Sequence, residues 1–328
     1  MNKIYHPEFL QTVLKETENF KALLNNSRKI LITTHERPDG DAAGSLLALS
    51  IALKLDNKEV VSHVPDPIPE YLSFLPDFDK ATSVNQDLSS FDLIIALDHS
   101  ELKRTRNSEI YKTKTPVVAI DHHATSDRIG TVVIVLPEAA ATSEILAEVI
   151  PTLGYKINSD IATCLLAGVV TDTGSFQHAN VSSHVLKISA KLMEKGGNLR
   201  GIMQSVFGGR SLRSLKIIGR ALERIETNPQ TGAAISVITY KDLAECGASL
   251  DDLSGVVNLL NSVPEAAFSL LLTEYEQGKL KGSLRSEPEK KIDVSKIAAM
   301  FGGGGHKLAS GFEIAGTLIK DENGWRIV

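Results

Sequence analysis

The sequence predicts an α/β fold: an N-terminal domain built on a parallel sheet, followed by a smaller C-terminal α+β domain. Over the first half of the chain, short and continuously apolar runs alternate with helical segments, which is typical of a parallel sheet covered on both faces. From about residue 228, strand-like runs follow one another with only short helices among them. We expect the first domain at 1–190, a helical linker at 191–227 and the second domain at 228–328.

Each element of the first domain follows from a local pattern. The run PVVAI is short, β-branched and opened by proline, and similar apolar runs recur along this part of the chain. The strands expected from such runs span 29–35, 59–64, 92–97 and 116–120. The helices expected around them span 7–25, 40–55, 141–150 and 159–170. Residues 182–226 have a mostly helical pattern interrupted by GGN and FGGR, which is why the linker is placed there.

The second domain begins where the pattern changes. Its expected strands are the segments GAAISVITY, AFSLLLTEYE and KLKGSLRS, because each is rich in apolar and β-branched residues. Short helices are expected at 250–260 and 293–301.

The composition limits the classes of function. The 328 residues include 42% hydrophobic and 23% charged residues, as in an ordinary globular protein. A net charge of -5 argues against a protein that coats long nucleic acid, but it leaves room for a small anionic substrate. Cys164 and Cys246 lie in separate apolar segments and are expected to be free thiols. No apolar run approaches the ~18 residues of a membrane span, so a cytoplasmic protein is expected.

Polar clusters follow three of the expected strands and one expected helix. The carboxyl ends of parallel strands meet at one edge of a sheet, where such side chains can gather. Taken alone, each cluster has a simpler interpretation. The segment PDGD, residues 38–41, can be a turn with a helix N-cap, and the other clusters can be solvated turns. The clustered residues are His35, Asp39, Asp41, Asp98, His99, Asp121, His122, His123 and Asp172.

Taken together, these clusters predict a metal site. Carboxylates mixed with imidazoles and without thiolates suit divalent ions such as Mn²⁺ or Mg²⁺. The number of donors exceeds the need of one catalytic ion and fits two ions about 3.5 to 4 Å apart, an arrangement used to attack phosphorus. The expected donors are His35, Asp39, Asp41, Asp98, His122 and Asp172.

The same segments resemble a known family. HERPDGDAAGS, the strand ending at Asp98, DHHATS and GVVTDTGSF are similar, in order and spacing, to the four motifs of DHH phosphoesterases. KGSLRS and FGGGGHKLASG resemble the DHH-associated domain that accompanies them. The length and the two domains resemble most the bacterial oligoribonuclease/pAp-phosphatase (nano-RNase) branch. The resemblance covers nearly the whole chain.

The resemblance implies roles for individual residues. One metal ion would be held by His35, Asp39 and Asp98, and a second by Asp41, Asp98, His122 and Asp172, with Asp98 bridging. His123 would act in catalysis beside the phosphate, and Asp121 would orient a histidine. Mn²⁺ is the expected ion, with Mg²⁺ as the alternative.

Substrate binding is expected in the second domain, with the active site in the cleft between the two domains. The glycine run lets backbone N–H groups approach an anion, and an arginine can bind a phosphate through two N–H groups. Ser283 and Arg285 are expected on one face of a strand. The residues expected to contact substrate are Ser283, Arg285, Gly302, Gly303, Gly304, Gly305 and His306.

The function predicted first is hydrolysis of very short oligoribonucleotides to mononucleotides, together with dephosphorylation of 3′-phosphoadenosine 5′-phosphate to AMP. Alternatives that use the same core are a cyclic- or linear-dinucleotide phosphodiesterase and an exopolyphosphatase-like hydrolase. A nucleotide sensor without catalysis is disfavoured because the donor set is complete. The expected partner is short single-stranded RNA or a nucleotide, with no membrane and no stable complex with long nucleic acid; a homo-oligomer stays open.

Overall fold

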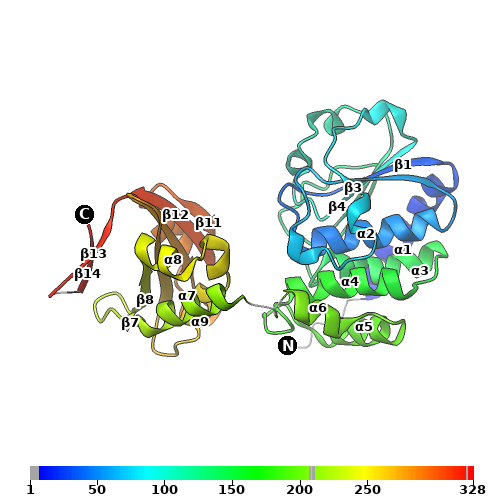
Figure 1. Cartoon of the computed structure of the whole chain (residues 1–328). Helices are drawn as coiled ribbons and strands as arrows, with labels where there is room; N and C mark the ends of the chain where they lie inside the picture. The colour runs from blue at the N-terminus through cyan, green and yellow to red at the C-terminus, as the bar shows by residue number, and fades with distance from the viewer. Residues whose placement is uncertain (1–6, 207, 209–210, 323) are drawn as a thin grey trace. The chain divides into compact units, whose positions relative to one another are not determined.

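A parallel sheet forms the centre of the first of two units. The computed structural model describes residues 7–206, 208, 211–322 and 324–328, and it divides into the units Met1–Gly208 and Gly209–Val328. Among the described residues of the first unit, six strands pair in parallel in the order β3-β2-β1-β4-β5-β6 (Figure 1). Their bounds are β1 (Lys29–Thr33), β2 (Glu59–His63), β3 (Ala81–Thr82), β4 (Leu93–Leu97), β5 (Val117–Asp121) and β6 (Val132–Val135). The strand order therefore reverses direction between β1 and β4.

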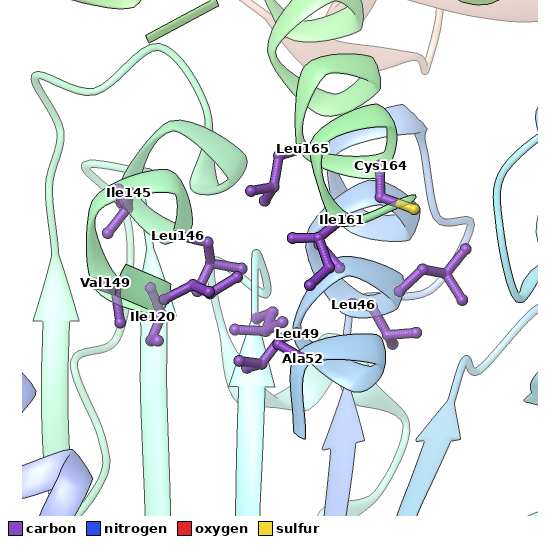
Figure 2. Packing of buried hydrophobic residues seen from close by; sticks show 14 of the residues in the cluster. Leu46, Leu49, Ala52, Ile120, Ile145, Leu146, Val149, Ile161, Cys164 and Leu165 are labelled. Atoms are coloured by element: carbon purple, nitrogen blue, oxygen red, sulfur yellow. The ribbon is translucent and has the colours of Figure 1, made fainter. Parts of the chain in front are cut away.

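Helices cover one face of this sheet and build the larger core. They are α1 (Pro7–Asn25), α2 (Gly40–Lys54), α3 (Thr142–Leu153) and α4 (Ser159–Asp172). Figure 2 shows part of this core, in which Ile120 of β5 lies beside Leu146 and Val149 of α3. Leu46 and Leu49 of α2 and Ile161 of α4 belong to the same cluster. Two further helices, α5 (Ser183–Glu194) and α6 (Leu199–Val206), pack on α4.

The opposite face of the sheet is covered by short 3₁₀ helices and loops. Ile94 and Ala96 of β4 point to this side, where they pack with Phe91, Leu102 and Ile110. Side chains alternate between the faces of a strand, so β4 is buried on both sides and its sequence is apolar throughout. The expected α/β class is confirmed, as are the four expected strands and four expected helices within a few residues; β3 and β6 were not predicted.

Helices α2 and α4 approach each other more closely than side chains would allow. A Cβ atom on Gly44 would lie 2.4 Å from the Cys164 carbonyl oxygen, and one on Gly40 would lie 2.4 Å from Thr171 Oγ1. On the facing helix, a Cβ atom on Gly168 would lie 2.6 Å from Asp41 Oδ1. Glycine is required at these positions because neighbouring backbone and buried side chains occupy the space.

The second unit has its own sheet and its own core. Within its described residues the strand order is β11-β12-β10-β9-β8-β7, with β8 and β9 parallel and the other pairs antiparallel. Its strands are β7 (Glu226–Thr227), β8 (Ala233–Ile238), β9 (Phe268–Glu276), β10 (Lys279–Arg285), β11 (Gly304–His306) and β12 (Ala309–Ala315), with a separate hairpin of β13 (Leu318–Asp321) and β14 (Gly324–Ile327). Its helices are α7 (Leu212–Glu223), α8 (Tyr240–Cys246), α9 (Val256–Asn261) and α10 (Val294–Ala299).

Strands β7 and β11 to β14 were not predicted from the sequence, and two predicted elements have other bounds than expected. The segment expected as one strand, GAAISVITY, ends its strand at Ile238, because the Thr239 side chain and Asp242 form a capping box that starts α8. The helix expected at 250–260 is divided into a 3₁₀ helix and α9, with Gly255 at a φ of 80° between them. Among the described residues, no helix combines the length and the apolar character needed to cross a membrane.

The close approach of α2 and α4 gives a stability prediction. Gly44→Ala should lower the free energy of unfolding by about 1–3 kcal/mol, since the added methyl group has no space beside the Cys164 carbonyl. Gly219→Ala is the matched control, because a Cβ atom at this position in α7 meets no atom within 4 Å. That variant should be more stable by about 0.5–1 kcal/mol. Urea denaturation measures both, and an unchanged Gly44→Ala protein would contradict the packing described.

Candidate active site

The expected polar residues converge where β1, β4 and β5 end. His35 follows β1, Asp98 follows β4, and Asp121 is the last residue of β5. Strands β1 and β4 are neighbours in the sheet, and the strand order reverses between them. A crevice at such a switch point is the usual ligand site of an open parallel sheet. Asp98 has a φ of 50°, a left-handed conformation that aspartate tolerates better than most residues.

His35, Asp39 and Asp98 form a first group of possible ligands. His35 Nε2 lies 3.6 Å from Asp98 Oδ2 and 4.0 Å from Asp39 Oδ2. On its other side, His35 Nδ1 lies 2.6 Å from the Glu36 carbonyl oxygen and 3.2 Å from Arg104 Nη2. The shorter contact, to a group that can only accept, favours a proton on Nδ1 and leaves Nε2 without one in the neutral ring. Asp39 Oδ1 accepts from the backbone N–H groups of Asp41 and Ala42 as the N-cap of α2. The capping interpretation of Asp39 is therefore confirmed for Oδ1, and Oδ2 stays available for the expected metal ligation.

Asp41, His122 and Asp172 form a second group. His122 Nε2 lies 3.2 Å from Asp172 Oδ2 and 3.5 Å from Asp98 Oδ1. Asp98 thus points one oxygen to His35 of the first group and the other to His122 of the second. In each of the two groups, ligand atoms of all three residues lie within 4.8 Å of one another. The structure therefore brings together all six expected metal ligands.

Asp41 is held by the start of α3. Its Oδ2 accepts from the Thr142 N–H at 2.6 Å and its Oδ1 from the Ser143 N–H at 2.9 Å. The Thr142 hydroxyl also donates to Asp98 Oδ1 at 3.1 Å. A role for Thr142 and Ser143 was not predicted from the sequence. The sequence contains one signal for such a contact: Ala141, a poor N-cap, precedes Thr142 and Ser143 at the start of the helix, so their N–H groups need an acceptor from elsewhere.

His123 lies beside the two groups and is oriented by Asp121. His123 Nδ1 is 2.8 Å from Asp121 Oδ1, and Asp121 Oδ2 accepts a hydrogen bond from the Ser100 N–H. This pairing places the proton of the neutral ring on Nδ1 and leaves Nε2 for another partner. His99 is fully buried near the same carboxylate, with its Nδ1 3.6 Å from Asp121 Oδ2. Its other ring nitrogen, Nε2, lies 3.6 Å from Asp127 Oδ1.

The second unit arranges its expected substrate residues in two rows across the sheet. Strand pairing puts Arg285, Ala309 and His306 side by side, on β10, β12 and β11. Two residues before Arg285 in β10, Ser283 pairs with Gly311 of β12, which in turn pairs with Gly304 of β11. With strands about 4.8 Å apart, roughly 10 Å separates the backbones of Arg285 and His306. The residues between and beside them are small, so the two side chains border an open stretch of sheet.

The glycines before His306 differ in their surroundings. A Cβ atom on Gly302 or Gly304 would meet no atom within 4 Å, which leaves their backbone open to a ligand. A Cβ atom on Gly303 would lie 2.2 Å from the Gly311 carbonyl oxygen, and one on Gly305 would lie 2.7 Å from the Ala309 carbonyl oxygen. Gly303 and Gly305 are therefore required for packing against β12.

The guanidinium of Arg285 donates one N–H group to the Asn258 side chain and a second to the Leu284 carbonyl oxygen of its own strand.

Comparison with known proteins identifies the family. The model of the DHH family N-terminal domain matches residues 29–169, and the model of the DHHA1 domain matches residues 231–323. The bifunctional oligoribonuclease and PAP phosphatase NrnA of Thermus thermophilus is 32% identical over 287 residues, which are 88% of this chain and 84% of that protein. The chain belongs to the DHH family. The resemblance inferred from its motifs is thereby confirmed.

Two further relatives of this DHH-family chain cover most of its length. The NrnA of Bacillus subtilis is 27% identical over 87% of the chain and 89% of that protein. The crystal structure of an exopolyphosphatase-related protein from Bacteroides fragilis superposes with a TM-score of 0.83 at 29% identity, covering 92% of both chains.

Negative charge is concentrated in the site of this DHH-family chain. Burial raises the pKa of Asp41 well above its ordinary value, and the Asp98 carboxylate raises it further. Burial likewise raises the pKa of Asp172, and the charge of Asp41 adds to the effect. Although burial alone would raise the pKa of Asp98, the surrounding histidines, His35 first, hold it well below the usual range. The protein thus neutralises the charge of Asp98 but leaves Asp41 and Asp172 without sufficient positive charge.

Divalent cations fit this set of donors. The side chains offer carboxylate oxygens and imidazole nitrogens, which suit ions such as Mn²⁺ and Mg²⁺. A bound cation would also supply the positive charge that Asp41 and Asp172 lack. The geometry and the electrostatics of the DHH-family site therefore both favour metal binding.

Proposed function

We propose that this chain is a two-metal phosphoesterase that hydrolyses very short oligoribonucleotides to mononucleotides and 3′-phosphoadenosine 5′-phosphate to AMP. The observation that supports this most is the position of Asp98 at the switch point of the sheet: it belongs to the first ligand group and lies 3.5 Å from His122 of the second. Relatives named oligoribonuclease and PAP phosphatase, aligned over more than four fifths of their length, support the choice of substrate. A cytoplasmic location stays a prediction.

We assign His35, Asp39 and Asp98 to one ion and Asp41, Asp98, His122 and Asp172 to the other. Asp98 is the bridging ligand in this proposal, because its two oxygens point to histidines of different groups. Mn²⁺ is the proposed ion. When bound, two such ions supply an activated water and positive charge for the phosphoryl group.

We assign His123 to the leaving oxygen of the substrate. Burial alone would lower its pKa, but the Asp121 carboxylate, followed by Asp98, holds the pKa of His123 above the ordinary value. The raised pKa favours the protonated ring, which can donate from Nε2 while Nδ1 stays paired with Asp121. Asp121 acts on the reaction by holding this orientation.

We assign substrate binding to Ser283, Arg285 and His306 and to the open backbone at Gly302 and Gly304, with Gly303 and Gly305 shaping the loop. Arg285 uses two of its five N–H groups inside the unit, and the others suit a phosphate. The small residues between Arg285 and His306 leave space for the sugar or base of a nucleotide. That one substrate engages both units stays a prediction.

A panel of substrates tests the proposed function. Purified protein with Mn²⁺ is offered RNA of two to about twenty nucleotides, 3′-phosphoadenosine 5′-phosphate, cyclic dinucleotides, polyphosphate and pyrophosphate. We expect short RNA and 3′-phosphoadenosine 5′-phosphate to be hydrolysed fastest. Faster hydrolysis of cyclic dinucleotides or polyphosphate would replace the proposal, and the absence of any hydrolysis would favour a nucleotide sensor.

The bridging role of Asp98 gives a prediction for turnover. Asp98→Asn should lower kcat for a dinucleotide by at least about 10³-fold, because Asp98 is proposed to bind both ions and lies next to histidines of both groups. Asp92→Asn, at the opposite end of the same strand, is the matched control and should keep a kcat close to that of the parent. Steady-state kinetics in saturating Mn²⁺ measures both. Near-normal turnover of Asp98→Asn would rule out the bridging role.

The second unit gives a prediction about the division of roles. Arg285→Ala and His306→Ala should each raise KM for nucleotide substrates by about 10-fold or more, since each removes a group that contacts phosphate. Mn²⁺ binding should be unchanged by calorimetric titration. Lys279→Ala, at the other end of β10, serves as the control and should leave KM unaltered. Loss of metal binding in either variant would show that the residue is wrongly assigned.

Substrate length gives the last prediction of the proposed function. The net charge of -5 provides no general attraction for a long polyanion, so contacts beyond the first few nucleotides should add little affinity. We therefore expect kcat/KM to fall as RNA lengthens from two to about twenty nucleotides, and duplex RNA to be a poor substrate. A comparison of 5′-labelled oligomers at fixed salt measures this. Equal or faster turnover of the longest strand would favour a processive exonuclease instead.

A further inference from the structure

Helix α3 starts without a capping side chain of its own. Ala141 occupies the N-cap and makes no side-chain hydrogen bond, although the first N–H groups of a helix need acceptors. The acceptor is Asp41, from the start of α2, which takes the N–H groups of Thr142 and Ser143 at 2.6 and 2.9 Å. A carboxylate at a helix N-terminus is further stabilised by the helix dipole. The start of α3 thereby fixes both oxygens of a ligand assigned to the second ion.

Thr142 also reaches Asp98, the residue proposed to bridge the two ions. Its hydroxyl donates to Asp98 Oδ1 at 3.1 Å, and the residue is fully buried. One residue therefore contacts Asp41 through its backbone and Asp98 through its side chain. These two carboxylates lie close enough to repel each other, as the effect of Asp98 on Asp41 indicates. A donor placed between them sets their separation and the direction in which Asp98 presents Oδ1.

We propose that Thr142 is a positioning residue for the two-metal site. Its hydroxyl holds Asp98 at a fixed place relative to Asp41. The inference rests on the proposed function, because it assumes that both carboxylates bind metal. Hydrogen-bond partners of metal ligands commonly contribute about 10- to 100-fold in metal affinity. Thr142 makes two such contacts, to ligands that arrive from α2 and from β4.

Replacement of the hydroxyl by a methyl group tests the inference. The full chain carrying Thr142→Val is stripped of metal with EDTA and titrated with MnCl₂ in a calorimeter. We expect Mn²⁺ to bind about 10- to 100-fold more weakly, with much of the lost turnover recovered at high Mn²⁺ concentration. Thr142→Ser, which keeps the hydroxyl, should restore most of the affinity. Thr17→Val is the control, since Thr17 is a buried threonine whose hydroxyl bonds a helix carbonyl in α1.

A second pair of variants guards against loss of folding. Thr142→Ser and Thr142→Ala differ by one hydroxyl oxygen, so weaker Mn²⁺ binding by the alanine variant supports the same role if the valine variant does not fold. Circular dichroism and thermal denaturation in EDTA establish folding for each protein.

The outcomes separate the inference from the proposed function. Parental affinity for Mn²⁺ in folded Thr142→Val or Thr142→Ala would overturn the positioning role while leaving the two-metal proposal intact. Failure of the parent chain itself to bind Mn²⁺ would overturn both.

Discussion

The close packing of α2 against α4 is the constraint on which the site depends. Glycines at 40, 44 and 168 remove the side chains that would otherwise hold the helices apart. As a result, the first turn of α2, which carries Asp41, lies beside the last turns of α4, which ends at Asp172. Two acidic residues from distant parts of the chain thus enter one ligand group. The sheet contributes the remaining ligands from the ends of neighbouring strands, so helix packing and strand order together determine the site.

The site also shows how a fold can tolerate buried acids. Asp41 and Asp98 are almost inaccessible to solvent, and an isolated buried carboxylate is costly. For Asp98 the protein supplies compensation through histidines and the Thr142 hydroxyl. For Asp41 the backbone of α3 supplies part of it, and the raised pKa shows that the rest is missing. A cation bound at this place would therefore contribute to the stability of the first unit as well as to its chemistry.

Much of this arrangement was predictable from sequence because it is encoded locally. An apolar strand followed closely by Asp or His places that residue at a sheet edge. Three such strand ends, together with Asp172 at the end of an apolar helix, predicted the ligand set. Strand β6, the run VVIV, was not predicted although it is equally apolar, because no polar motif follows this short run. The end of β8 was misplaced because the capping box of Thr239 and Asp242 was overlooked. Contacts between segments about one hundred residues apart, such as Asp41 with Thr142, have no local signature and required the structure.

The capping of α3 by Asp41, a proposed metal ligand, links local folding to any loss of function at position 41. Most substitutions there would leave two helix N–H groups buried without an acceptor, in addition to removing a proposed donor to the metal. A damaging change at position 41 is therefore expected to lower the amount of folded protein in a cell, whereas Asp172 accepts no comparable pair of helix N–H groups among its described contacts. For the design of an inert protein that still captures its substrate for crystallography, Asp41 is consequently the wrong residue to change, and Asp172, which is only partly buried, is the better choice.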